Sequence, residues 1–203
     1  MQDVVVWSGS KKGNYTVKFG YYVAKKLQME ESNLRESSRQ GTNGALWSRI
    51  WQANVRNKIK IFSWRACLNI LPTQVNLARR RVVEKAWCSS CQLEEESVLH
   101  VLWGCGAAQD VWVGSLPRLQ KSSTVQPDFL QLVTSLMLRL SREEWDLFWV
   151  TCWQIWNQRN TTMHGGVFQH PSRSSQRALE YLREFTEAQD QLRVSAPILS
   201  APQ

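Results

Sequence analysis

The sequence lacks most features that would place it in a membrane or assign it an enzymatic reaction. It has no run of about 18 apolar residues, so no membrane-spanning helix is expected, and its start does not resemble a secretory signal. It has no glycine-rich phosphate-binding loop. Its carboxylates cluster at residues 94–96 and 143–144, where no spaced Asp or His completes a hydrolytic pattern. We therefore expect a non-catalytic protein that stays inside the cell.

What is present is typical of a globular protein with a basic surface. Of the 203 residues, 43% are apolar and 21% are charged, which suffices to bury a core without disulfide bonds. The 25 Lys and Arg residues exceed the 17 Asp and Glu residues, and the net charge of +8 favours a polyanionic partner such as nucleic acid. The whole excess lies in residues 49–85, which contain nine basic residues and one acid.

The hydrophobic periodicity predicts a mostly α fold, a helical bundle with an N-terminal β-hairpin. The hairpin is expected within residues 4–17, and the polar, serine-rich residues 30–44 are expected to form a mobile linker. Helices are expected at residues 19–29, 46–51, 58–69, 74–80, 107–113, 129–140, 141–160 and 171–193. We divide the chain into a domain over residues 1–115, a helical connector over 116–193 and a disordered tail over 194–203.

Two of these helices begin with capping signals. Thr73 directly follows Pro72 and can accept a hydrogen bond from a free backbone N–H of the next helix. Ser141 and Glu144 have the spacing of a capping box, in which each side chain accepts a bond from the other residue's backbone N–H.

The helix over residues 58–69 is expected at the centre of the core, because apolar residues cover much of its circumference. These residues are Ile59, Ile61, Phe62, Trp64, Ala66 and Leu68. We also expect Trp47, Trp51 and Trp64 to pack with Phe62 in this core.

Four of the 11 Trp residues step by four, four and three along one predicted helix, and are Trp145, Trp149, Trp153 and Trp156. A stripe at this spacing is most often part of a core, although it could also stack on bases or dock a partner protein. Cys67 and Cys152 lie in apolar helical stretches, and we interpret them as core residues.

Three of the five cysteines and one histidine have the spacing of a metal site, and they are Cys88, Cys91, His100 and Cys105. A Cys-x2-Cys turn presents two thiolates to one cation, and three thiolates with one imidazole form the closed tetrahedral set of structural zinc. The alternative is three unliganded thiols and a surface histidine. We predict one structural Zn²⁺ ion with no open coordination position, bordered by Trp87 and Trp103.

The spacing of the last two ligands constrains the local backbone. His100 and Cys105 are five residues apart, so on a continuous α-helix their side chains would diverge by about 140°. We infer that a helix carrying His100 ends near Trp103, and that Gly104 lets the chain turn to bring Cys105 to the metal.

The basic residues before this cluster are candidates for contact with a phosphate backbone. We expect non-specific contacts to RNA or DNA from Lys58, Lys60, Arg65, Arg79, Arg80 and Arg81. The alternative is a solvated basic face, or one that packs on an acidic patch of another protein domain.

Many of these positions resemble the zinc-binding domain that follows the polymerase in plant non-LTR (LINE-type) retrotransposon reverse transcriptases. The resemblance covers about residues 3–115. The residues that carry it are, in chain order, Trp7, residues 13–18, residues 20–21, Trp47, Ile50, Trp51, residues 58–65, residues 71–73, Asn76, Leu77, Arg80, Cys88, Cys91, Glu95 or Glu96, His100, Cys105 and Trp112. Residues 148–149 and 155–160 resemble the connector that leads to an RNase H-like domain in the same elements. One departure is Arg56, where the family usually has Pro.

The resemblance implies a fragment of a reverse transcriptase that keeps the zinc module. The sequence has no Tyr-x-Asp-Asp polymerase motif and no Asp/Glu/Asp set of an RNase H. We therefore expect a non-catalytic, zinc-stabilised module that binds nucleic acid non-specifically, in the nucleus or the cytoplasm. The alternative is a structural module that docks polymerase or RNase H-like domains of the parent element without binding nucleic acid itself.

Overall fold

The computed structural model describes residues 40–119, 126–167 and 169–194, and the structural statements below concern these residues. Almost all of them belong to one compact unit that begins at Leu46. The predicted hairpin over residues 4–17, the predicted helix over 19–29, most of the predicted linker and the tail beyond Val194 lie outside the described residues.

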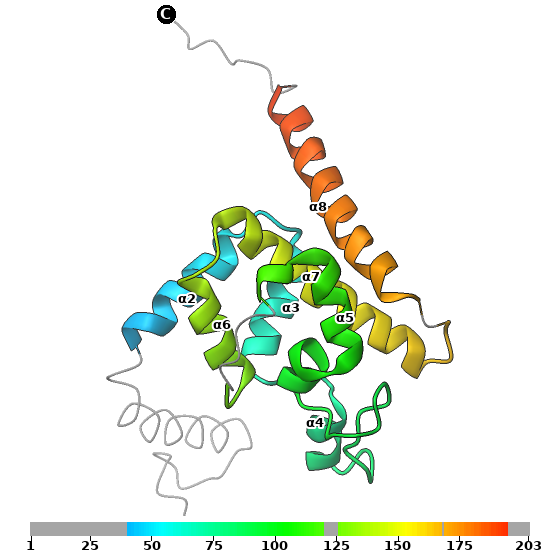
Figure 1. The fold of residues 1–203 in the computed structure, drawn as a ribbon. Helices are drawn as coiled ribbons and strands as arrows, with labels where there is room; N and C mark the ends of the chain where they lie inside the picture. Colours follow the sequence, from blue (N-terminus) through cyan, green and yellow to red (C-terminus); the bar gives the residue numbers. More distant parts are fainter. Residues whose placement is uncertain (1–39, 120–125, 168, 195–203) are drawn as a thin grey trace, which may run out of the picture. The chain divides into compact units, whose positions relative to one another are not determined.

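The described part of the chain is helical (Figure 1). Helices α2 to α8 span Gln40–Gln52, Asn57–Cys67, Gln74–Arg79, Gly106–Ser115, Phe129–Met137, Arg142–Met163 and Pro171–Val194. A π-helical turn, η1, spans His100–Gly104, and a 3-10 turn, η2, spans Pro117–Leu119. The β-structure among these residues is one isolated bridge between Trp87 and Glu95. The mostly α prediction is therefore confirmed for the described ranges.

The long helix α7 is the element against which the others pack. It contacts α3, α5, α8 and η1, and ten of its residues are buried. Trp145 and Trp149 are buried in van der Waals contact with Phe148, which also stacks on Trp112 of α5 at 5.3 Å between ring centroids. Trp156 is buried and Trp153 is half-buried. The tryptophan stripe thus belongs to the core, as its spacing predicts.

The predicted caps fix the starts of two helices. Thr73 Oγ1 accepts a hydrogen bond from Asn76 N at 3.3 Å at the start of α4. At the start of α7, Ser141 Oγ accepts from Glu144 N at 3.2 Å, and Glu144 Oε2 accepts from Ser141 N at 2.8 Å. Both halves of the capping box are present, so each helix begins directly after its predicted cap.

The expectation that α3 lies at the centre of the core is wrong for one of its sides. Ile59, Phe62 and Ala66 are buried against α6 and α7, and Cys67 is buried with them. The opposite side leaves Ile61 47% and Trp64 37% exposed, with Leu68 also exposed. The reason is that, among the described elements, α6 and α7 cover only one side of this helix.

The predicted partners of Phe62 also differ from the structure. Trp51 and Trp64 are exposed, whereas Phe62 contacts Trp153 and Trp156 of α7 at 5.3 and 6.3 Å between ring centroids. Trp47 is half-buried against the core. Phe62 therefore finds its aromatic partners about 90 positions away in sequence, on α7.

Residues 40–44 are the part of the predicted linker that the structure describes, and they form the first turns of α2. Leu46 and Ile50 anchor this helix in the core, and no proline interrupts the backbone between residues 40 and 52. The helix therefore extends upstream of its apolar stripe, into the last five residues of the predicted linker.

Packing is continuous across residue 116, where we divided the domain from the connector. Helix α5, which ends at Ser115, packs on α7 and on α8. Cys152 of α7 is buried, as predicted. Within the described ranges no helix has the length and apolarity needed to cross a bilayer.

Candidate metal centre

The loop between α4 and η1 folds back on itself and places the first two cysteines. Cys88 N donates to Glu94 O at 2.8 Å, and Gln92 N donates to Cys88 O at 2.8 Å. Gln92 adopts the left-handed conformation, with φ of 56°, which closes the tight turn. Glu96 N donates to Ala86 O at 2.7 Å and completes a small knuckle. Cys88 and Cys91 thus come from opposite ends of one short turn.

The other two ligand candidates are placed by η1. Cys105 N donates to His100 O at 2.7 Å, which is the i to i+5 bond of a π-helical turn. A π turn holds more residues than an α turn, so positions five apart return to the same side. Cys105 then leaves the helix with φ of −64° and ψ of 136°. The predicted helix end near Trp103 and Gly104 is confirmed, and the wide turn supplies the convergence that an α-helix would prevent.

The four side chains form one compact donor set. One ligand atom from each of Cys88, Cys91, His100 and Cys105 lies within 4.8 Å of the others. Cys88 Sγ and Cys105 Sγ are 3.9 Å apart, and Cys91 Sγ lies 3.3 Å from His100 Nε2. Tetrahedral zinc, with Zn–S of about 2.3 Å and Zn–N of about 2.0–2.1 Å, requires separations of about 3.8 and about 3.6 Å. The arrangement therefore fits one zinc ion.

The ionisation of the Cys88 thiol also favours the binding of a cation. Cys88 and Cys105 are buried, and a hydrogen bond from the Cys105 thiol lowers the pKa of Cys88 well below that of an ordinary thiol. A thiolate is the form of cysteine that binds metal. The same hydrogen bond raises the pKa of Cys105, so without a cation this pair of thiols holds one proton. Burial raises the pKa of Cys152 and of Cys67, which lie outside the donor set and stay neutral in the core.

Glu94 and Ser97 fix the orientation of the histidine. His100 Nδ1 lies 3.0 Å from Glu94 Oε2, and the His100 backbone N donates to Ser97 Oγ at 3.0 Å. With Nδ1–H donating to this carboxylate, Nε2 is free to bind a metal, an arrangement common among metal-binding histidines. The sequence alone did not identify Glu94 as the partner of His100, because it is one of three consecutive glutamates.

A buried ion pair joins the knuckle to α7. Glu96 is fully buried, and its carboxylate accepts from Arg159 Nε at 3.2 Å and from Arg159 Nη2 at 2.5 Å. Glu96 Oε1 also accepts from Gln74 N at 2.9 Å, at the start of α4. One carboxylate thus ties the knuckle, α4 and α7 together. Sequence reasoning missed this pair, although each residue belongs to a string that carries the family resemblance.

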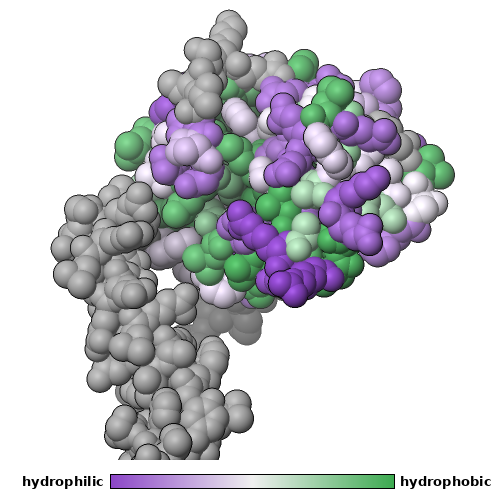
Figure 2. Space-filling view, turned by 90° about the horizontal axis from the view of Figure 1, so that it is seen from below, coloured by the Kyte–Doolittle hydropathy of each residue, from purple (hydrophilic) through white to green (hydrophobic). Residues whose placement is uncertain are grey.

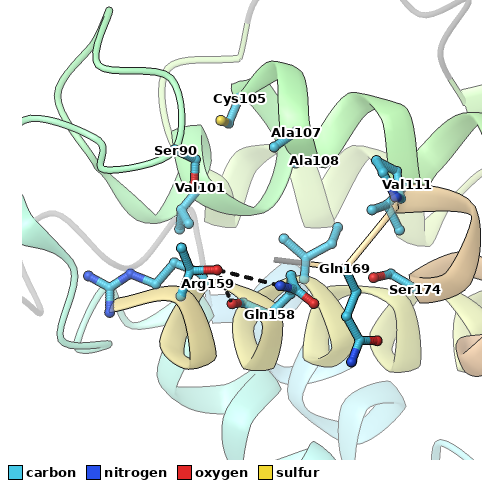
Figure 3. A pocket seen from close by; sticks show the side chains of 13 residues that line it. Ser90, Val101, Cys105, Ala107, Ala108, Val111, Gln158, Arg159, Gln169 and Ser174 are labelled. Atoms are coloured by element: carbon cyan, nitrogen blue, oxygen red, sulfur yellow. Dashed lines mark hydrogen bonds between the residues drawn. The ribbon is translucent and has the colours of Figure 1, made fainter. Parts of the chain in front are cut away.

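The space behind Cys105 is too small for an organic ligand. A cavity of about 30 Å³ lies between α5, α7 and the start of α8. Figure 3 shows Cys105 and Ala107 on one side of it, with Gln158 and Arg159 of α7 on the other. Helix α7 therefore closes this side of the metal centre.

The six predicted nucleic-acid contacts divide into two groups. Lys60 Nζ donates to Trp51 O at 2.9 Å, and Lys58 Nζ lies over the rings of Trp153 and Tyr181 at 5.5 and 5.6 Å. The other four, Arg65, Arg79, Arg80 and Arg81, are exposed and have no hydrogen bond, ion pair or ring contact within the described ranges. Figure 2 views the molecule from the side on which α4 lies in Figure 1. Strongly hydrophilic side chains lie next to apolar ones on this face.

Two more basic residues of this stretch serve the fold. Arg49 donates to the carbonyl oxygens of Met137 and Leu140 at the end of α6, the latter at 2.7 Å, and lies over the Trp145 ring at 4.9 Å. Arg56 lies over the Tyr181 ring at 5.2 Å. The net charge of residues 49–85 therefore overstates the number of cations available to a ligand.

Comparison with known proteins agrees with the geometry. Residues 25–112 match the family model described as zinc-binding in reverse transcriptase. The Arabidopsis thaliana protein named "Putative ribonuclease H protein At1g65750" is 25% identical over 168 residues, which cover 81% of this chain and 26% of that protein. The chain thus spans about a quarter of the length of this relative. No solved structure matches the chain.

The matched range contains the whole donor set, and its description names the metal that the distances fit. Zinc is therefore the cofactor, one ion for the cluster of Cys88, Cys91, His100 and Cys105. The predicted resemblance is confirmed for this part of the chain, because residues 25–112 match the model of the zinc-binding region in reverse transcriptase.

Proposed function

We propose that this chain is a non-catalytic module of a plant LINE-type reverse transcriptase, which binds RNA or DNA non-specifically and acts in the nucleus or the cytoplasm. The observation that carries the proposal is the set of exposed arginines Arg65, Arg79, Arg80 and Arg81, which have no partner among the residues that the structure describes. Such guanidinium groups break no ion pair when they turn toward phosphate, and they contact it without reading the sequence.

In this proposal the metal has a structural role. Cys88, Cys91, His100 and Cys105 are the four ligands, and a zinc ion with four protein ligands has no open position to activate water. Bound zinc supplies a rigid cross-link between the knuckle and η1. Glu96 extends this cross-link to the start of α4 through Gln74 N, and α4 ends at Arg79. The cluster thereby holds the arginines at the end of α4 in place.

Lys58 and Lys60 belong to the same proposed interface as secondary contacts. Each ammonium group has three donors, so the bond from Lys60 Nζ to Trp51 O leaves two for phosphate. No acidic residue lies in α3 or α4. The surface of these two helices therefore carries a single sign of charge.

The test is a salt titration of binding to single-stranded RNA and to duplex DNA, with the full zinc-loaded chain. We expect a steep loss of affinity as salt rises. Replacing Arg79, Arg80 and Arg81 with Ala in one variant should reduce the slope of log affinity against log salt concentration by about two for single strands, at about 0.7 per phosphate contact.

The matched control removes three exposed arginines of α8 through Arg173→Ala, Arg177→Ala and Arg183→Ala. Equal slopes for the two triple variants would contradict the proposal, and a zinc-loaded chain that binds no nucleic acid would favour a module that docks other protein domains.

A further inference from the structure

A groove of about 330 Å³ lies between α3 and α7, and none of the four zinc ligands lines it. Its lining residues are Lys58, Ile61, Phe62 and Arg65 of α3, Leu71 and Pro72 beyond it, and Trp153 and Trp156 of α7. A concavity of this size falls within the range of small-ligand pockets. The groove occurs where α3 has one exposed side, so its mouth is open to solvent.

The arrangement along α3 places cations at both ends of an apolar floor. Lys58, Ile61, Phe62 and Arg65 follow the spacing i, i+3, i+4 and i+7, so they share one face of the helix. Seven residues of helix separate Lys58 from Arg65 by about 10 Å along the axis. Between them, Phe62 is buried and Ile61 is half exposed.

The wall opposite α3 is aromatic. Trp153 is half-buried and meets the Phe62 ring edge-on, with the centroids 5.3 Å apart and the planes at 75°. Lys58 Nζ lies 5.5 Å from the centre of the Trp153 ring, which holds this cation at the rim. Aromatic rings that border a groove offer a flat apolar face to a flat apolar ligand.

The charge of the lining favours an anion. No carboxylate lines the groove, and Arg65 is exposed and has no partner within the described residues. A ligand that combines a flat aromatic group with a negative charge on either side of it matches both features. Duplex nucleic acid buries its base faces by stacking, so only an unpaired nucleotide presents one to such a groove.

We propose that the groove between α3 and α7 takes an unpaired base of single-stranded nucleic acid, with the flanking phosphates bound by Lys58 and Arg65. This inference rests on the proposed function and adds a preference to it. The arginines at the end of α4 bind any phosphate backbone, whereas the groove distinguishes a strand with exposed bases from one without them.

The experiment compares three probes of equal phosphate number: a single-stranded oligothymidylate, an abasic strand of the same length and a duplex. The full zinc-loaded chain is used. We expect the oligothymidylate to bind at least about fivefold more tightly than the abasic strand, since stacking of one base contributes about 1–3 kcal/mol. Ile61→Glu places a carboxylate in the groove at a position that is half exposed, and should lower this ratio to about one. Duplex binding should change little.

The matched control is Val113→Glu, which introduces the same charge on the exposed side of α5 and should leave the ratio unchanged. Zinc content and the helical circular dichroism signal check that both variants are folded. An equal affinity of the unmodified chain for oligothymidylate and abasic strand would overturn the groove proposal, as would the same loss in Val113→Glu and Ile61→Glu. In either case, salt-dependent binding that still requires the α4 arginines would leave the proposed function standing.

Discussion

The metal centre with α7 and the surface formed by α3 and α4 use charged side chains in opposite ways. Around the metal centre, Glu96, Arg159 and His100 are buried, and each bonds to a named partner. On the surface of α3 and α4, Arg65 and the arginines at residues 79–81 are exposed and unpaired within the described residues. A substitution in the first region should change stability, and one in the second should change ligand binding.

This difference separates two kinds of basic residue that look alike in sequence. Arg49 is half-buried and donates to the carbonyl oxygens at the end of α6, and the buried Arg159 is paired with Glu96. Arg65 and Arg79 are exposed and contact no acid within the described residues. Charge density along a sequence therefore indicates where a binding surface could form, and only the partners decide which cations belong to it.

The largest effect is expected from breaking the metal centre. Cys88→Ser replaces a fully buried ligand with an oxygen that holds zinc poorly, so the chain should lose its zinc and the knuckle its cross-link. Structural zinc contributes apparent binding energies of about 10–16 kcal/mol in small zinc peptides, so a loss of several kcal/mol is expected here. Zinc analysis and thermal unfolding measure both outcomes.

Cys152→Ala is the control for this prediction, because it removes a buried thiol of α7 that is not part of the donor set. This variant should keep one zinc ion per chain. Unchanged zinc content in Cys88→Ser would show that the four side chains do not form the site.

The second largest effect is expected at the buried ion pair. Arg159→Met leaves the Glu96 carboxylate buried without its main partner, which should lower the free energy of unfolding by about 3–5 kcal/mol. Adding Glu96→Gln removes the orphaned charge and should recover part of this loss. Arg142→Met, at an exposed position of the same helix, should cost less than about 0.5 kcal/mol in a urea titration. Equal costs for the two arginine variants would show that the pair does not join the knuckle to α7.

The donor set could be predicted from the sequence because its signal is local. Three thiolates and an imidazole at short spacing are a common ligand set of structural zinc, and residues 88–105 contain all four ligands. The wide turn of η1 could not be predicted, since the i to i+5 bond has no clear sequence signal. The convergence of His100 and Cys105 was predicted, whereas the π-helical turn that produces it was not.

Long-range partners explain the other differences. Glu96 and Arg159 are 63 residues apart, and periodicity within either segment gives no information about their pairing. The same holds for α3, whose apolar residues cover two sides, although α6 and α7 bury mainly one of them among the described elements. Periodicity predicts that a helix has an apolar side, but the neighbours decide which side is covered. The tryptophan stripe of α7 was predicted correctly because neighbours cover it along most of its length.

The smallest effect is expected at Asp146, a buried carboxylate of α7 that accepts from Asn54 N at 2.9 Å. Burial raises its pKa above 3.8, and the hydrogen bond from Asn54 and the charges of Arg142, Lys60 and Arg49 only partly offset this. The folded chain therefore holds this proton more tightly than the unfolded chain. The stabilisation it provides is complete below pH 3.8 and is lost as the pH rises through the higher folded-state pKa.

Asp146→Asn keeps an oxygen acceptor for Asn54 N but cannot ionise. The free energy of unfolding of this variant, relative to that of the unmodified chain, should therefore increase as the pH rises from 3.8 through the folded-state pKa of Asp146. Above that pKa the difference should continue to rise with pH until Asp146 is fully ionised in the folded chain, and then stay constant. Loss of zinc on acidification affects both proteins and cancels in the difference. A difference that stays flat, or that falls with rising pH, would mean that the carboxylate at position 146 is as well accommodated when charged in the folded core as in water.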